Sequence, residues 1–198
     1  MRFKKYFILL VSVSLVYGYG FALEQEFVVD KAHSSISFTV RHMVVSKVRG
    51  NFNDFDVTIK ADPDDITKSS VTAVIKAASI DTDNEKRDAH LRSADFFDVE
   101  KFPEITFKSV RVKKKDDKYE LWGTLTMHGV TKNIIVPFEV LGQMTDRGGN
   151  TVVGVEAQLE LDRKDYGLTW NRTLDKGGLL VGTEVKIEIL LEIRSKKK

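Results

Sequence analysis

The chain has 198 residues, of which 42% are hydrophobic and 30% are charged, with 31 basic and 29 acidic side chains and no cysteine. This composition excludes a disordered chain, a collagen-like fibre and a disulfide scaffold, and the lack of cysteine excludes thiolate redox or metal chemistry. No internal repeat or low-complexity linker divides the chain, and its length therefore favours a single domain.

The first 22 residues have the order of features of a secretory signal peptide. Three basic residues precede an apolar run over residues 6–17, and small residues flank a cleavage site after Ala22. The alternative is a transmembrane anchor, but a bilayer requires about 20 consecutive apolar residues, and two glycines interrupt this shorter run. We expect residues 1–22 to be a cleaved signal peptide, and residues 23–198 to form a mature domain without a transmembrane anchor.

Cleavage removes three basic and no acidic residues, which leaves 28 basic against 29 acidic side chains. The mature chain is therefore almost neutral. Neither remaining basic tract, at 111–118 or 194–198, alternates with aromatic residues as a platform for single-stranded nucleic acid does. We expect no nucleic-acid partner.

Alternation of apolar and polar residues with period 2 marks the strands of an all-β domain. Turn signals rich in Asp, Asn, Gly or Lys separate these runs, which indicates about eight antiparallel strands joined mostly by hairpins. In chain order the runs cover residues 36–40, 55–59, 71–75, 105–112, 121–127, 134–140, 153–161 and 185–193.

Residues 83–93 break the alternation and predict a short helix. Thr82 followed by Glu85 fits a capping box at its start. Asp88 and Arg92 are four residues apart and are expected to form a surface ion pair. The alternative interpretation places Arg87, His90 or Arg92 at a barrel mouth, where it meets a polar head group.

Such strands predict a sandwich or a barrel, and an eight-stranded barrel is either packed with side chains or holds one small ligand. Small residues at 73, 123, 154 and 157 favour open space inside, but glycines in strands also mark bends. The residues alone leave both outcomes open. Three phenylalanines in the irregular stretch 94–103, together with Trp170, are placed to cover one end of such a barrel.

The sequence carries no recognisable catalytic or metal motif. Its histidines, at positions 33, 42, 90 and 128, are far apart, and none has the spacing of a metal site. Ser34 and Ser35 follow His33 directly, but neighbouring residues on a strand point to opposite faces, which does not support a nucleophilic triad.

The motifs together resemble the YceI-like family of polyisoprenoid-binding proteins over essentially the whole mature chain. They occur in the family's order: Asp30-x-x-His33-Ser34-x-Ile36-x-Phe38-x-Val40-x-His42, Val48-x-Gly50-x-Phe52, Ser79-Ile80-Asp81-Thr82, Arg87-Asp88-x-His90-Leu91-Arg92-Ser93-x-Asp95-Phe96-Phe97-Asp98, Phe102-Pro103-x-Ile105-x-Phe107 and Gly123-x-Leu125-Thr126-x-His128-Gly129-Val130-Thr131.

The resemblance implies a periplasmic, lipocalin-like antiparallel β-barrel whose long interior binds an isoprenoid or similar amphiphile, with no catalytic residues, metal or cofactor. It implies that Phe38, Val40, Ile75, Phe107, Leu125, Met127 and Phe138 line the interior, that Leu91, Phe96, Phe97 and Trp170 close one end, and that His42, Arg87, His90 and Asn171 are candidates to bind the head group.

Three functions remain open from the sequence. The first is a carrier or store for an isoprenoid quinone, its precursor or another long-chain lipid. The second is an enzyme acting on such a lipid with His42, His90 or His128 as acid or base. The third is a barrel with a filled core that acts through a protein partner, and a homodimer is possible in each case. An elongated cavity favours the first two, and a packed interior favours the third.

Overall fold

The computed structural model describes residues 25–196, except residues 44, 63–64 and 174–178. The expected signal peptide therefore lies outside the described residues. Among the residues that are described, no helix has both the length and the apolar character needed to cross a membrane.

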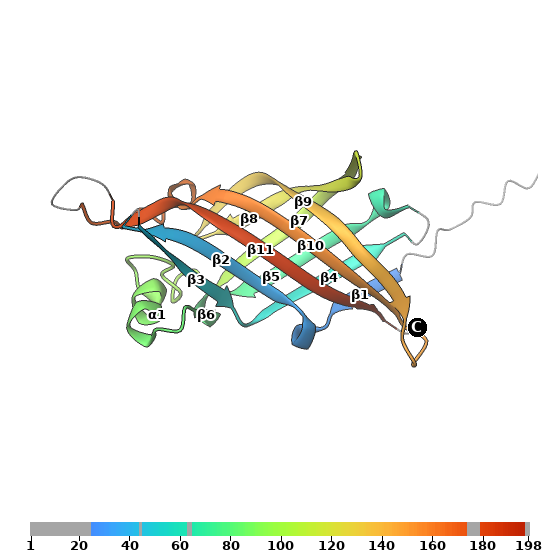
Figure 1. Cartoon of the computed structure of the whole chain (residues 1–198). Coiled ribbons are helices and arrows are strands. Elements are labelled where there is room, and N and C mark those ends of the chain that lie inside the picture. The colour runs from blue at the N-terminus through green and yellow to red at the C-terminus, as the bar shows by residue number, and fades with distance from the viewer. Residues whose placement is uncertain (1–24, 44, 63–64, 174–178, 197–198) are drawn as a thin grey trace, which may run out of the picture.

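The described chain consists of strands, with one short α-helix (Figure 1). The helix is α1 (Glu85–Arg92), and short 3₁₀ turns lie at Lys31–His33, Ile66–Lys68, Ala77–Ser79 and Arg163–Tyr166. The strands are β1 (Gln25–Val29), β2 (Ser35–His42), β3 (Ser46–Phe52), β4 (Phe55–Ala61), β5 (Ser70–Lys76), β6 (Ile80–Asp81), β7 (Glu104–Lys115), β8 (Lys118–Met127), β9 (Val130–Thr145), β10 (Thr151–Asp162) and β11 (Val181–Ser195).

These strands form one closed antiparallel barrel. Eight of them pair in the order β1, β4, β5, β7, β8, β9, β10 and β11, and β11 pairs back with β1. The remaining strands extend this ring, because β2 continues β1, β3 leads into β4, and β6 follows β5 after a 3₁₀ turn. The expected eight-stranded antiparallel barrel with a short helix is confirmed.

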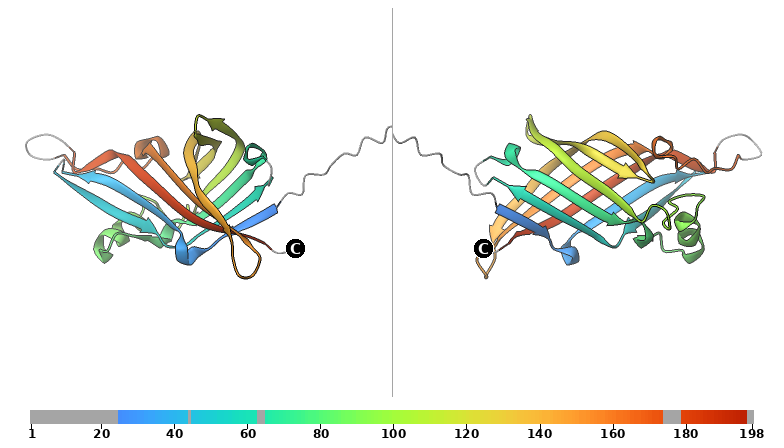
Figure 2. Two further views of the ribbon diagram at one scale, coloured as in Figure 1. Left: turned by 45° about the vertical axis from the view of Figure 1, so that its right-hand side comes forward. Right: turned by 180° about the vertical axis from the view of Figure 1, so that it is seen from behind.

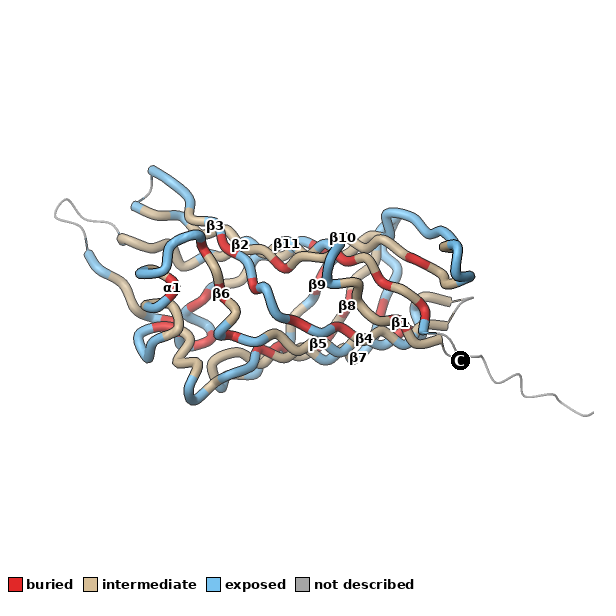
Figure 3. The backbone as a smooth tube through the Cα atoms, turned by 90° about the horizontal axis from the view of Figure 1, so that it is seen from below, coloured by how far each residue is buried: buried red, intermediate tan, exposed pale blue. Residues whose placement is uncertain are grey.

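Alternate side chains of each strand point into the barrel, as the period of 2 predicts, and the buried positions are distributed along its whole length (Figure 3). A bulge in β7 shifts this alternation. The register to β8 changes between Ser109 and Arg111, so that Phe107 and Val112 both face inward while Val110 is 73% exposed.

Helix α1 lies at one end of the barrel, and the described C-terminal end of the chain lies at the other (Figures 1 and 2). We call these the helix end and the opposite end. Strand β10 runs between them, since it begins with Thr151 beside the β9–β10 hairpin and ends with Asp162 just before the turn Arg163–Tyr166.

The helix begins at a cap different from the one expected. Asn84 is the N-cap, and its side-chain oxygen accepts a hydrogen bond from the backbone N–H of Arg87 at 3.0 Å. The expected capping box of Thr82 and Glu85 is therefore wrong. Thr82 is buried, and its hydroxyl donates instead to Asp88.

Candidate functional site

An apolar cavity of about 700 Å³ occupies the barrel interior. This volume lies within the range of roughly 300–1,000 Å³ that is usual for small-molecule sites. All eleven strands contribute side chains to its wall, and most of these are aliphatic or aromatic. The wall also includes a few polar side chains: Gln25, Ser37, Asp62, Ser69, Tyr119, Gln143, Thr151 and Arg163.

Most of the site residues named from the sequence lie along this wall. They come from distant parts of the chain, and closure of the barrel brings them together. They are Phe38, Val40, Ile75, Leu91, Phe96, Phe97, Phe107, Leu125, Met127 and Phe138. Their part in ligand binding stays a prediction.

The residues named for the head group lie outside the set that lines the cavity. Asn171 holds the start of β11: its side chain donates to the carbonyl of Val181 at 2.6 Å and accepts from the Val181 N–H at 3.2 Å. His42 ends β2, opposite Ser46 and Val181. The side chain of His90 contacts Asp95, with 2.9 Å between Nε2 and Oδ2.

Arg87 belongs to a polar network that fixes α1 to the preceding strand. Its guanidinium donates to the hydroxyl of Thr82 at 2.7 Å and to the carbonyl of Thr82 at 2.6 Å. Asp88 is only 5% exposed and accepts from both the backbone N–H and the hydroxyl of Thr82. These bonds leave Arg87 turned toward Thr82 rather than toward the cavity.

The expected surface ion pair between Asp88 and Arg92 is wrong. Asp88 is buried against Thr82, and Arg92 donates to the carbonyls of Ala78 and Ile80 at 2.7 and 2.6 Å. Both side chains therefore join the helix to the segment before it. A helical spacing of four residues allowed the ion pair, but tertiary contacts supplied better partners.

Three aromatic rings cover the helix end of the cavity. Phe96 lines it, and His90 and Trp170 pack against Phe96 with ring centroids 5.0 and 5.2 Å away. His90 and Trp170 also meet edge to face at 4.7 Å. Trp170, which was expected to close this end, therefore lies behind Phe96 and outside the set that lines the cavity.

Arg163 is the functional candidate that the sequence reasoning missed. It lines the cavity although it is only 5% exposed. Its guanidinium donates to the carbonyls of Gly182 at 2.9 Å, Leu168, and Val181 at 3.4 Å. Burial lowers the pKa of Arg163, and the nearby Asp162 acts against this effect. Arg163 follows Asp162 at the end of a strand, and nothing in the neighbouring sequence predicts that its side chain is buried.

The opposite end of the cavity has a different polar character. Asp62, Ser69, Gln143 and Thr151 line it there, close to the start of β10. The Ser69 hydroxyl is buried and has no hydrogen-bond partner among the described residues. The two ends therefore differ: the helix end has the buried cation Arg163, whereas at the opposite end the Asp62 carboxyl group lies 3.7 Å from Lys68 Nζ.

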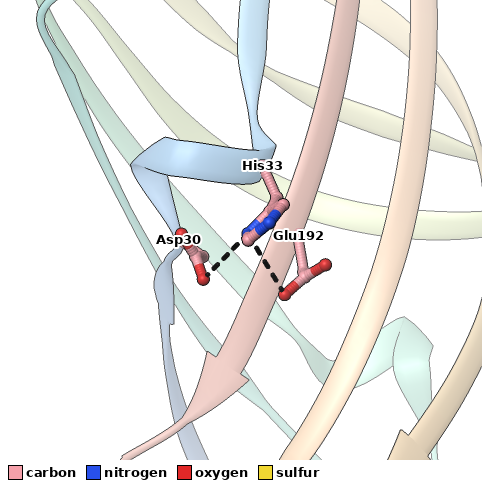
Figure 4. A group of neighbouring side chains, drawn as sticks. All are labelled: Asp30, His33 and Glu192. Carbon is pink, nitrogen blue, oxygen red and sulfur yellow. Dashed lines mark ion pairs between the residues drawn. The ribbon is translucent and has the colours of Figure 1, made fainter.

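Asp30, His33 and Glu192 form a group with possible metal-ligand atoms on the outside of the barrel (Figure 4). His33 Nδ1 lies 3.3 Å from Asp30 Oδ2 and 3.9 Å from Glu192 Oε1. The guanidinium of Arg194 already contacts these same two oxygens, at 2.8 and 2.9 Å. A metal ion would have to displace this cation, so the group does not favour a metal site.

The same group explains part of the sequence motif that begins at Asp30. The Asp30 side chain accepts from the N–H of Ala32 at 3.0 Å and so caps a 3₁₀ turn. The Ser34 hydroxyl accepts from the N–H of Glu192 at 2.9 Å. Burial raises the pKa of Asp30, but hydrogen bonds from His33 and Ala32 and the charge of Arg194 outweigh this effect and lower it. The motif thus fixes the turn between β1 and β2 onto β11.

The sequence-family model of the YceI-like domain matches residues 27–193 of this chain. The chain belongs to this family. A UPF0312 protein of Staphylococcus aureus strain MSSA476, SAS2572, is 38% identical over 167 residues, which cover 84% of this chain and 95% of the relative.

Two solved structures have a fold similar to that of this chain. BcnA of Burkholderia cenocepacia is 25% identical in sequence and superposes with a TM-score of 0.73. The superposition covers 83% of this chain and 98% of the BcnA chain. A polyisoprenoid binding domain from Saccharophagus degradans is 16% identical, covers 86% of this chain and 98% of its own, and has a TM-score of 0.61, which shows the common fold.

Proposed function

We propose that this protein binds a long apolar ligand inside the barrel and acts as a periplasmic carrier or store for it. The ligand is a polyisoprenoid, an isoprenoid quinone or precursor, or a similar amphiphilic lipid. The observation that carries the proposal is the cavity of about 700 Å³ with an almost entirely aliphatic and aromatic wall.

The apolar wall favours chain-like ligands on energetic grounds. Each methylene moved from water into such an interior contributes about 0.8 kcal/mol, so a long tail binds tightly with few polar contacts. Affinity is then expected to rise with chain length. The similar fold of the polyisoprenoid binding domain from Saccharophagus degradans supports the same ligand class. The signal-like residues 1–22 support the periplasmic assignment.

Binding is favoured over catalysis because the histidines do not line the cavity. His42, His90 and His128 are all outside the set of residues that line it. His128 is instead held through Nδ1, which lies 3.0 Å from the carbonyl oxygen of Tyr166. An acid or base that acts on a bound lipid must reach the ligand, and none of these three side chains lines the cavity.

The test is extraction of the mature protein, purified gently from its native host, with organic solvent, followed by mass spectrometry of the extract. A prenyl or long-chain species in stoichiometric amount is the expected result. The matched control is the Phe107→Trp variant purified in parallel, whose narrowed interior should retain much less of the same species. An empty extract in repeated preparations would contradict the proposal and favour a barrel that acts through a protein partner.

A further inference from the structure

Arg163 places a buried positive charge in the wall of an apolar cavity. A guanidinium has five N–H donors, and three of them are used by the carbonyls of Gly182, Leu168 and Val181. Two donors therefore remain. In the described part of the chain no carboxylate forms an ion pair with Arg163, and a buried cation without a counter-charge is costly.

The acidic residues nearest in sequence are committed elsewhere or exposed. Asp162 is exposed, and its side chain accepts from the backbone N–H of Lys164 at 2.9 Å. Asp165 forms an ion pair with Lys132 at 2.8 Å. Glu184, which pairs with Asp162 across β10 and β11, is also exposed. Asp162 acts on Arg163 through its charge, but none of these three carboxylates forms an ion pair with it. A ligand can therefore supply an ion-pair partner.

We propose that Arg163 binds the head group of the ligand, and that this head group carries an anionic oxygen, as in a prenyl phosphate or a long-chain carboxylate. This inference rests on the proposed function. A guanidinium suits such groups because its planar donors match phosphate and carboxylate oxygens. The face of Phe96, 6.0 Å from the guanidinium carbon, borders the same position.

Arg163 sets the direction of the ligand. At the opposite end the Asp62 carboxyl group already has partners, because it lies 3.7 Å from Lys68 Nζ and accepts a hydrogen bond from the Asp65 N–H at 3.1 Å. The head therefore lies at the helix end beside Arg163, and the apolar tail extends between the strands toward Ser69 and Gln143. Strand β10, which runs between the two ends, has twelve residues and is therefore roughly 36–40 Å long at about 3.3 Å per residue.

The test compares two probes with one tail, farnesyl phosphate and farnesol, by isothermal titration calorimetry with the mature protein. We expect the wild type to bind the phosphate roughly ten- to hundredfold more tightly, as hydrogen bonds to a charged group allow. The Arg163→Gln variant should lose this preference and still bind farnesol. Arg172→Met, which removes an exposed arginine near the same end, is the matched control and should keep the preference.

A second measurement reports contact directly and does not require a variant that folds. The second pKa of a phosphate monoester is about 6 in water, and a neighbouring guanidinium lowers it because it stabilises the dianion. A ³¹P NMR titration should therefore give a lower phosphate pKa for farnesyl phosphate bound to the wild type than for the free probe.

The Arg163→Lys variant keeps a cation but not the planar donors. It should retain only part of the preference for the phosphate in calorimetry.

Each result distinguishes this inference from the proposed function. Equal affinity for the two probes, or an unshifted phosphate pKa in the bound state, would overturn the role of Arg163 while leaving lipid binding intact. An Arg163→Gln variant that folds and keeps the full preference would do the same. Failure of the wild type to bind either probe would refute the proposed function itself.

Discussion

Single small residues control how much space the barrel contains. Gly123 lies under the ring of Phe107: a Cβ at this position would be 2.4 Å from Phe107 Cζ and 2.5 Å from the carbonyl oxygen of Lys108. Gly123 was one of the residues taken to favour open space, and in the structure a neighbouring ring fills that position. Gly154 differs, because its Cβ would meet Leu141 at an ordinary 3.5 Å.

The substitution Gly123→Ala should therefore lower the free energy of unfolding by about 1–3 kcal/mol, because the ring must move into the cavity and the backbone oxygen cannot yield easily. Chemical denaturation measures this change. Gly154→Ala is the matched control in a neighbouring part of the sheet, and we expect it to cost much less. Equal effects of the two substitutions would show that the close approach of Phe107 is not what requires a glycine.

At the scale of elements, α1 is held by buried polar bonds together with the contact of Leu91 with the apolar interior. Asp88 accepts two hydrogen bonds from Thr82, and the Thr82 hydroxyl accepts a hydrogen bond from Arg87.

Asp88→Ala should lower the free energy of unfolding by about 1–3 kcal/mol in denaturant, because it leaves the buried donors of Thr82 without an acceptor. Glu85→Ala, on the exposed first turn of the same helix, should change stability little. An equally small effect for Asp88→Ala would contradict the network.

The β9–β10 hairpin should loosen at acid pH. Asp146 accepts hydrogen bonds from the Asn150 side chain at 2.8 Å, the Asn150 N–H at 2.9 Å and the Gly148 N–H at 2.8 Å, and these bonds lower its pKa. A lowered folded-state pKa contributes stability above the ordinary value of about 3.9, and this contribution is lost as the pH falls through the folded-state value.

Unfolding measured as a function of pH checks this expectation. The wild type should lose stability below about pH 4 more steeply than Asp146→Asn, which has no carboxyl group to titrate at this position. Parallel profiles for the two proteins would show that Asp146 does not contribute to the acid sensitivity.

At the scale of the whole molecule, the cavity depends on the tilt and closure of the complete barrel. Phe107 lies in its wall, so Phe107→Trp should obstruct the interior and abolish binding of a long lipid while the barrel remains folded. Lipid binding by calorimetry and folding by circular dichroism measure the two effects. Val110→Trp, on the same strand but 73% exposed, is the control and should bind normally. Unchanged binding by Phe107→Trp would contradict the assignment of Phe107 to the ligand path.

The sequence by itself determined the class of fold, the positions of eight of the eleven described strands and most of the apolar wall, whereas β1, β3 and β6 were not among the predicted alternating runs. Period-2 alternation is a local property: once Ile36, Phe38 and Val40 share one face of a strand, burial of that face puts all three inside. The bulge that exposes Val110 interrupts this rule, because only pairing with β8 decides where the extra residue lies.

Only the tertiary structure decided the polar contacts. Asp88 and Arg92 had a favourable local spacing, but Thr82, Ala78 and Ile80 lie closer once α1 packs against the preceding segment. Arg163 enters the cavity wall because the carbonyls of residues 168, 181 and 182 converge on its guanidinium. A buried charge is tolerated where distant backbone groups meet it, and no local pattern in the sequence encodes that meeting.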